Sequence, residues 1–418
     1  MLDINKIRQN KHEVEQALLK RLKPMDFNLD DILRLDDERR VLITGIDKLK
    51  SERNLASKNK PTPEVIIKMK KIGEEIKKAE DRRSKIEDQL FEIMSALPNL
   101  PAEDVKPGGK ENNSVLRSYG KSPKFNFKPK DHVELATALG LIDYERAVKM
   151  SGSGFWAYTG DGALLEWALL NYFIDFHRQH KGWQFMIPPY LLTEQSAYTS
   201  GHLPKFKDDL FWTQEGSCLN ATSEMMLLNY HREEILKESD LPKKYFAYSA
   251  CFRREAGSYR TEERGMVRGH QFNKIEMFEF VKPSESWQVF DELTKYAEEL
   301  VKGLGLHFQT VQLAAADASV AMAKTIDIEV WIPSMNIYKE VSSVSNALDY
   351  QARRGNIRYK ILKTGKNEFV HTLNGSGLAT SRLIPAILEQ NQQPDGSVKL
   401  PKVLQKFLGK KILKNDKN

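Results

Sequence analysis

The chain has 418 residues, of which 40% are hydrophobic and 29% charged, a balance typical of a folded protein with two or three domains. Its two cysteines, Cys218 and Cys251, exclude a disulfide scaffold and a cysteine-based zinc cluster, and we expect both to be reduced thiols. The net charge of +7 suits a polyanionic partner but by itself leaves nucleic-acid binding open.

Nothing in the sequence predicts a membrane or an export route. The opening stretch MLDINKIRQN has neither an apolar signal segment nor the composition of a transit peptide. No uncharged apolar run reaches the ~18 residues of a membrane span, and the best candidate, Ala163 to Phe176, is interrupted by Glu166 and Asp175. We therefore expect a cytoplasmic protein without a membrane segment.

A seven-residue hydrophobic repeat runs through the first hundred residues in two blocks. The first block has the seam Leu35, Leu42, Leu49 and Ala56, with Ile32 and Ile46 beside it. The second block has the seam Val65, Ile72, Ala79, Ile86 and Ile93, with Met69, Ile76, Leu90 and Leu97 beside it. Two such blocks predict two long antiparallel coiled-coil helices, the second of them roughly 50 Å long.

The break between the blocks, residues 57–63, predicts a tight turn, with Thr62 as N-cap and Pro63 as first helical residue. The tip of this hairpin is basic, and its cations are Lys48, Lys50, Arg53, Lys58 and Lys60, opposed only by Glu52. A solvated coiled-coil tip is the simpler interpretation of that charge. The alternative is a rigid arm that carries positive charge to a distant phosphate backbone.

The rest of the chain alternates strand-like and helical segments. Residues 101–123 are rich in Pro and Gly and predict a linker. Strands are expected at 183–187, 273–281 and 326–332, and helices at 284–302, with Ser284 as N-cap, and at 378–390. This order predicts an α+β domain with a mainly antiparallel sheet and flanking helices.

The densest polar segment is an arginine-rich stretch between two strand-like runs. The sequence contains no P-loop or Rossmann motif for nucleotide binding and no HExxH motif for zinc binding. Two strands joined by the loop near 253–268 would direct Arg253, Glu255 and Glu276 into one cleft, where the planar guanidinium fits a phosphate. A surface loop of paired salt bridges is the alternative.

Three further polar clusters are weak signals when taken singly. On a regular strand Glu340 and Ser342 would face one way and Ser343 the other, and a carboxylate with a hydroxyl could hold Mg²⁺ or simply form a polar edge strand. Residues 371–382 place glycines at the entry of a helix with Arg382 one turn in, or merely cap that helix. Residues 222–224 would either begin a helix or contribute polar side chains to a binding pocket.

The order of these clusters, together with the hairpin, resembles the seryl-tRNA synthetases, a family of class II aminoacyl-tRNA synthetases, over nearly the whole chain. The second class II motif matches residues 252–258, 264–265 and 270–272, and the third matches 374–379 with Arg382. The looser first motif resembles the helix 163–180 and Pro188-Pro189. Features of the seryl type are Thr222-Ser223-Glu224, residues 340–346 and residues 351–354, with Ser223 in place of the usual alanine.

The resemblance implies a role for each motif residue. The implied catalytic residues are Arg253, Glu255 and Arg382, and the implied Mg²⁺ ligands are Glu340 and Ser343. The implied ATP-binding residues are Arg253, Arg254, Glu255, Phe272, Glu340, Val341, Ser342, Ser343 and Arg382. The implied serine-binding residues are Thr222, Ser223, Glu224, Arg253, Glu276, Asn374 and Ser376, and the implied tRNA-binding residues are Lys48, Lys50, Arg53, Lys58 and Lys60.

The resemblance also implies an activity and an architecture. The protein would activate L-serine with ATP and Mg²⁺, transfer it to tRNA(Ser), and work as a homodimer. A tRNA-binding helical arm would occupy residues 1–110 and a class II catalytic domain residues 111–418. Two alternatives are a paralogue that loads an amino acid onto a carrier protein or other acceptor, and a non-catalytic RNA-binding paralogue.

Overall fold

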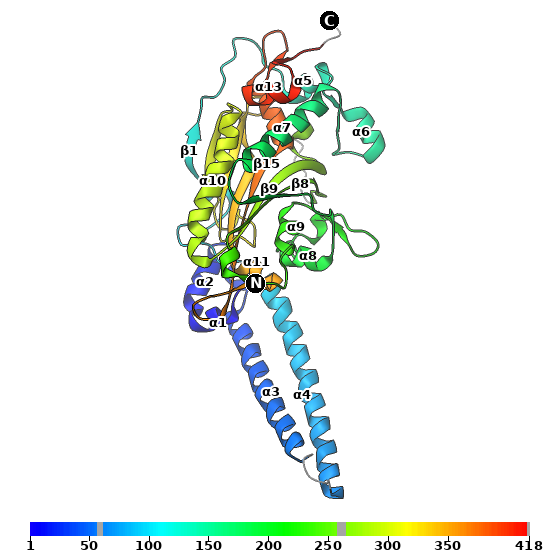
Figure 1. Ribbon diagram of the computed structural model, residues 1–418, viewed down its shortest axis with the longest axis vertical. Coiled ribbons are helices and arrows are strands. Elements are labelled where there is room, and N and C mark those ends of the chain that lie inside the picture. Colours follow the sequence, from blue (N-terminus) through cyan, green and yellow to red (C-terminus); the bar gives the residue numbers. More distant parts are fainter. Residues whose placement is uncertain (57–61, 257–264, 416–418) are drawn as a thin grey trace. The chain divides into compact units, whose positions relative to one another are not determined.

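The computed structural model describes residues 1–56, 62–256 and 265–415, which form two compact units, Met1–Leu100 and Pro101–Asn418. The described part of the first unit is helical, whereas the second is built on a β-sheet (Figure 1). No helix among the described residues is long and apolar enough to cross a membrane. Cys218 and Cys251 are both buried free thiols, as expected.

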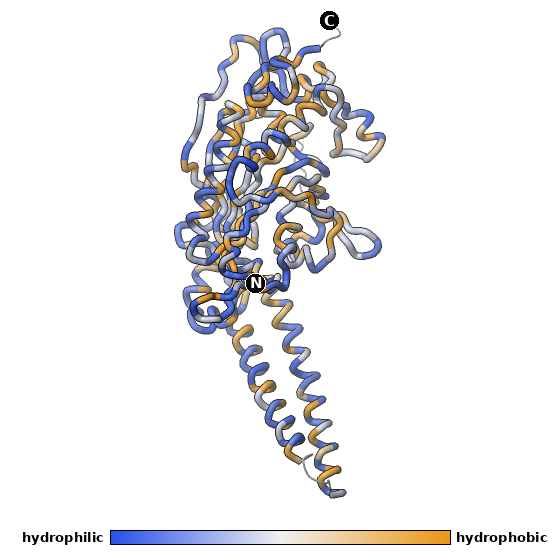
Figure 2. The backbone as a smooth tube through the Cα atoms, viewed as in Figure 1, coloured by the Kyte–Doolittle hydropathy of each residue, from blue (hydrophilic) through white to orange (hydrophobic). Residues whose placement is uncertain are grey.

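The first unit contains the expected hairpin. Its short helices α1 (Ile4–Gln9) and α2 (Lys11–Leu19) precede the long helices α3 (Leu29–Ala56) and α4 (Pro63–Ala96) (Figure 1). Apolar residues recur between hydrophilic ones along both long helices (Figure 2), and Ile46, Ile72 and Ile76 form a buried cluster between them. The predicted cap is confirmed, because the Thr62 side chain accepts a hydrogen bond from the Val65 amide. The predicted turn at 57–61, including Lys58 and Lys60, lies outside the described residues.

A buried carboxylate fixes the base of this unit. Asp36 is fully buried and accepts hydrogen bonds from Arg8 at 2.8 Å and Arg39 at 2.7 Å, with Arg40 Nε a further 2.8 Å neighbour. Burial acts to raise the pKa of Asp36, but the hydrogen bonds from Arg39 and Arg8 outweigh it and the pKa is lowered. This ion cluster ties α1 to α3.

One large sheet organises the second unit. Among the described residues it has eight strands in the order β1-β10-β11-β12-β15-β9-β8-β4, antiparallel except for the parallel β4–β8 pair. Their bounds are β1 Ser114–Tyr119, β4 Trp183–Met186, β8 Lys243–Phe252, β9 Gln271–Val281, β10 Phe308–Gln312, β11 Lys324–Ile332, β12 Ile337–Leu348 and β15 His371–Ala379. The predicted α+β class with a mainly antiparallel sheet is confirmed.

The two faces of the sheet have different partners. Helices α7 (Asp161–Arg178), α10 (Ser286–Gly303) and α12 (Thr380–Gln390) cover one face with a large apolar core (Figure 1). Residues alternate along β9, so Ile275 and Met277 enter this core, while Phe278 and Phe280 pack with α9 (Glu224–Asn229) and α11 (Tyr350–Gly355). Glu276 shares the second face with Phe278.

Three expected boundaries were wrong. The supposed linker contains β1, which pairs with β10, a partner far away in sequence. Helix α10 begins at Ser286 after a 3-10 turn over Pro283–Glu285, so its N-cap is Glu285 rather than Ser284. Leu378 lies in β15, because the glycines before it continue the strand instead of opening a helix. A Cβ atom on Gly377 would lie 2.4 Å from His177 Nε2, so only glycine fits that close approach.

We predict opposite effects for two glycine-to-alanine changes. Gly73→Ala in α4 meets no atom within 4 Å and should stabilise the helix by ~0.8–1 kcal/mol. Gly377→Ala should destabilise the second unit by ~1–3 kcal/mol through overpacking against His177. Urea unfolding followed by circular dichroism reports the helices, and tryptophan fluorescence reports the second unit, since all 6 tryptophans lie there. An unchanged fluorescence midpoint in Gly377→Ala would contradict this packing.

Candidate active site

A cavity of about 440 Å³ opens on the face of the sheet opposite the helix-covered core. Strands β9, β12 and β15 form its floor, the end of β8 and the start of α9 border it, and residues 200–210 and 319–322 contribute the remaining wall. Most of the residues predicted to bind serine, ATP or Mg²⁺ line it: Thr222, Glu224, Arg253, Glu255, Glu276, Glu340, Ser343, Asn374 and Ser376. Residues from several segments between positions 200 and 376 of the sequence thus meet in one cavity.

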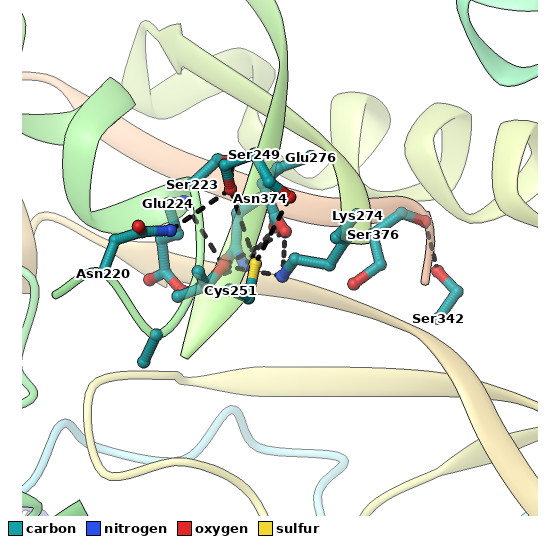
Figure 3. Close-up of polar contacts among 12 residues, drawn as sticks. Asn220, Ser223, Glu224, Ser249, Cys251, Lys274, Glu276, Ser342, Asn374 and Ser376 are labelled. Atoms are coloured by element: carbon teal, nitrogen blue, oxygen red, sulfur yellow. Dashed lines mark hydrogen bonds and ion pairs between the residues drawn. The ribbon is translucent and has the colours of Figure 1, made fainter. Parts of the chain in front are cut away.

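A lysine–glutamate pair lines the cavity, and Figure 3 shows its two side chains. Lys274 and Glu276, two positions apart on β9 and therefore on the same face, form an ion pair, and both are buried. Lys274 Nζ also donates to Thr222 Oγ1 at 2.6 Å, and Thr222 Oγ1 donates to Glu276 Oε2 at 3.2 Å. Asn374 Nδ2 on β15 donates to Glu276 Oε1 at 3.2 Å. This network holds α9, β9 and β15 together.

Glu224 adds a second buried carboxyl group to the cavity. It accepts from Gln351 Nε2 at 2.6 Å and from Asn374 Nδ2 at 3.3 Å. Burial raises the pKa of Glu224 to about 7, with Glu276 adding to the rise and the Gln351 hydrogen bond opposing it. The carboxyl group of Glu224 is therefore easier to protonate than that of an ordinary glutamate.

Arg253 lies where β8 leaves the sheet. Its backbone amide donates to His270 O at 2.9 Å, its Nε donates to Ala221 O at 3.3 Å, and its guanidinium stands over the Phe272 ring at 5.1 Å. Two residues later Glu255 adopts a positive φ of 52° and forms an ion pair with Arg268. The backbone thus aims a guanidinium and a carboxylate into the same cavity.

The loop beyond this point is only partly described. Arg254 is exposed, does not line the cavity, and contributes its backbone amide to Asp209 O at 2.9 Å. The Ala256 amide donates to Asp209 Oδ1, also at 2.9 Å. Gly257, Ser258 and Arg264, which carry part of the second motif, lie outside the described residues.

An acidic corner lies at the other end of the site. Arg382 donates to Glu340 O at 2.9 Å, to Glu340 Oε2 at 3.2 Å and to Val267 O at 3.0 Å. Asp327 faces Ser343 across the β11–β12 pair, and its Oδ1 is buried without a hydrogen-bond partner among the described residues. Burial, with Glu340 adding to the effect, raises the pKa of Asp327 well above its usual value.

A β-bulge explains which residues of β12 reach this corner. Ser342 pairs with Ile328 and Glu340 with the next residue, Glu329, so Val341 is the extra residue. Glu340 and Ser343 consequently line the cavity together, whereas Ser342 is buried and donates to Ser376 O at 2.6 Å. The expectation that Glu340 and Ser342 share a face was wrong, because it assumed a regular strand.

Several expected contact residues support the site from behind. Ser223 is buried with its Oγ 2.6 Å from Ser249 Oγ (Figure 3). Val341 is also buried, and neither Val341 nor Ser223 lines the cavity. Phe272 and Arg382 border a smaller adjoining pocket that also includes Arg253 and Glu255.

Among the residues of the cavity or its acidic corner that sequence reasoning did not assign to the site are Lys274, His202, Arg268 and Asp327. The two-residue spacing of Lys274 and Glu276 on a strand was a usable signal for the first. His202 and Asp327 had none, since only sheet pairing and loop packing bring them in.

Two protein-family models match this chain, one in each of its two compact units. Residues 1–101 match the model for the seryl-tRNA synthetase N-terminal domain, and residues 205–391 match the class II tRNA synthetase core domain of the G, H, P, S and T types. Serine--tRNA ligase 2 of Clostridium acetobutylicum is 53% identical over 98% of this chain and 99% of its own length. The serine--tRNA ligase of Carboxydothermus hydrogenoformans is 44% identical over 98% of both chains.

Solved structures agree with these relatives. The seryl-tRNA synthetase of Pyrococcus horikoshii complexed with ATP superimposes with a TM-score of 0.93 at 34% identity, covering 99% of each chain. The cytoplasmic serine-tRNA ligase of Naegleria fowleri in complex with AMP gives 0.88 at 31% identity, covering 100% of this chain and 99% of that one. Sequence, domain order and fold therefore agree, and the chain belongs to the seryl-tRNA synthetase family of class II aminoacyl-tRNA synthetases.

Proposed function

We propose that this protein is an ATP-dependent serine–tRNA ligase that forms seryl-adenylate and transfers serine to the 3′ end of tRNA(Ser). The observation that carries the proposal is the single cavity in which two buried carboxyl groups, Glu224 and Glu276, face the guanidinium of Arg253. Such a cavity offers acceptors for an ammonium and a hydroxyl group beside a donor for a carboxylate and a phosphate.

The buried polar end is the proposed serine pocket. Thr222, Glu224, Glu276, Asn374 and Ser376 would surround the ammonium and hydroxyl groups, and Arg253 would hold the carboxylate. Ser223 would act indirectly, through Ser249. A pocket that hydrogen-bonds a substrate hydroxyl discriminates strongly against alanine, because its buried polar groups would otherwise stay unpaired.

The adjoining end is the proposed ATP site. Arg253 would bridge to the α-phosphate, Phe272 would stack on the adenine, Glu255 would contact the adenine end, and Arg382 would hold the γ-phosphate. Glu340, Val341, Ser342 and Ser343 form the strand wall beside the phosphates, with only Glu340 and Ser343 exposed to the cavity. Arg254 would join the site only by turning inward.

The residues at the acidic corner fit a magnesium ion. Glu340 and Ser343 provide oxygen ligands, and the orphaned Asp327 Oδ1 nearby is a buried acceptor that a cation would satisfy. Among the described residues no group of three or more His, Cys, Asp or Glu side chains is arranged to hold a metal alone. Mg²⁺ would therefore arrive with the ATP phosphates, whose charge it neutralises.

The chemistry needs positioning rather than a covalent nucleophile on the protein. A serine carboxylate oxygen attacks the α-phosphorus and pyrophosphate leaves. A ribose hydroxyl of the terminal adenosine of tRNA then attacks the carbonyl carbon and AMP leaves. Fixed cations such as Arg253 and Arg382 stabilise the charge that develops on the phosphates during the first step.

An exposed apolar surface supports a homodimer. Five large apolar side chains of α7, of β4 and of the segment that follows β4 are exposed: Leu164, Trp167, Phe185, Ile187 and Leu191. Trp167 is 54% and Ile187 69% exposed. Such a group of exposed apolar residues marks an interaction surface, and a second copy of this chain would cover it. We further propose that the enzyme works in the cytoplasm, where tRNA and ATP are both available.

The helical unit is proposed to bind tRNA. Residues 1–110 were expected to form this arm, and Lys48, Lys50 and Arg53 near its described tip would contact phosphates together with Lys58 and Lys60. Lys50 is already paired with Glu80 at 2.8 Å, so it would have to exchange that partner for a phosphate.

The direct test is pyrophosphate exchange into ATP with each standard amino acid in turn. Serine alone should support rapid exchange. Arg253→Ala should reduce the exchange rate by ~10²–10³, because the developing phosphate charge loses a donor. Circular dichroism checks that the variant is folded. Exchange with another amino acid, or undiminished exchange in the variant, would contradict the proposed function or the role of Arg253 respectively.

A pH series tests the role of Glu224. Because the pKa of this acid is raised to about 7, it is increasingly protonated below that pH, so the KM for serine should rise as the pH falls from 8 to 6. Glu224→Gln mimics the protonated acid and should have a KM raised roughly tenfold or more at pH 8, with little further change at pH 6. The KM for ATP serves as the control. The same pH dependence in both proteins would assign it to another group.

Shortening the hairpin should separate the two half-reactions. Replacing residues 43–78 by a short Gly/Ser linker removes the self-contained cluster of Ile46, Ile72 and Ile76 but leaves the Asp36 ion cluster in place. Exchange with serine should persist. Charging of tRNA(Ser) should fall by orders of magnitude, mainly through KM, and the salt slope of tRNA binding should drop by roughly 0.7–0.9 per lost phosphate contact. Near-normal charging would show that the arm is only structural.

A further inference from the structure

One histidine in the cavity wall has no role in the activity described so far. His202 follows α8 (Glu194–Thr199) in the loop over residues 200–204 and lines the cavity together with Arg253, Lys274 and Glu224. Its Nδ1 lies 2.8 Å from Ser200 Oγ.

The hydrogen bonds of Ser200 determine which ring nitrogen carries the proton. Ser200 Oγ donates its one proton to Ala197 O at 3.0 Å. It can therefore only accept from His202, so Nδ1 carries the hydrogen and Nε2 has a free lone pair. Nε2 makes no hydrogen bond to any described residue, and the ring lines the cavity.

Burial and the neighbouring cations keep this ring neutral. Burial, together with the charges of Arg253 and Lys274, lowers the pKa of His202 to about 3. At neutral pH the cavity therefore contains an uncharged acceptor beside two cations that can only donate.

We propose that His202 is a serine-binding residue whose Nε2 accepts a hydrogen bond from a donor group of the bound amino acid, its ammonium or its hydroxyl. The inference rests on the proposed function, since it assigns a contact within the same pocket. A ligand without a donor at this point would leave the acceptor unpaired, so His202 would contribute to selection of the substrate as well as to affinity.

Two amide substitutions distinguish the two ring nitrogens. The side-chain amide of Gln reaches about as far as Nε2, whereas that of Asn reaches about as far as Nδ1. His202→Gln should therefore restore the acceptor in the cavity and keep the KM for serine within about threefold of wild type. His202→Asn keeps only the contact with Ser200 and should raise the KM for serine roughly tenfold or more, with the KM for ATP unchanged. Thermal unfolding of each variant controls for folding.

Competitive inhibition of serine-dependent exchange identifies the donor. L-alanine keeps the ammonium and lacks the hydroxyl, whereas 3-hydroxypropanoate keeps the side-chain hydroxyl and has no donor group on Cα. Weaker inhibition of His202→Asn by L-alanine assigns the ammonium, and weaker inhibition by 3-hydroxypropanoate assigns the hydroxyl.

The inference and the proposed function fail in different ways. Wild-type protein without serine-dependent exchange would overturn the function itself. Normal exchange in the wild type, combined with an unchanged KM for serine in His202→Asn or a larger loss in His202→Gln than in His202→Asn, would overturn the inference and leave His202 with a role in holding the loop only.

Discussion

The cavity depends on the burial of opposite charges two residues apart on β9. Burying Lys274 and Glu276 is costly unless each keeps an ionic partner and its remaining hydrogen bonds. Thr222, two residues before α9, and Asn374 on β15 supply those bonds. The register of β9 against β15, which places Ser376 opposite Glu276, is therefore linked to the integrity of the site. A shift by one residue would move both charges into the apolar core.

The same strand connects the site to the helices behind the sheet. Glu166 on α7 is buried and accepts from Asn273 Nδ2 at 2.7 Å and Thr380 Oγ1 at 2.6 Å. Asn273 stands between Phe272 and Lys274 on β9, and Thr380 opens the helix that carries Arg382. One carboxyl group thus positions two of the motifs at once. The helix that bears it also exposes Trp167, so the proposed subunit interface and the proposed ATP site share a rigid element.

Local irregularities adapt a regular sheet to chemistry. The bulge at Val341 turns Glu340 and Ser343 toward the same cavity, beside the buried Asp327. The positive φ of Glu255 similarly re-aims its carboxylate toward Arg268 just after β8 ends. Both features are small departures from an ideal strand, and both occur where the proposed ATP and metal contacts are made.

The sequence by itself determined the elements whose signals are local. The heptad blocks and the Thr62 cap predicted the hairpin, because coiled-coil contacts repeat at fixed spacing along each helix. The resemblance of the motifs predicted one site for Arg253, Glu276 and Arg382; Arg253 and Glu276 line the cavity, and Arg382 borders the adjoining pocket. Only the tertiary structure decided what depends on partners distant in sequence: the pairing of the supposed linker as β1, the bulge in β12, and the entry of His202 into the cavity. Strand partners, bulges and loop packing are set by long-range contacts, and these leave no periodic trace in a single sequence.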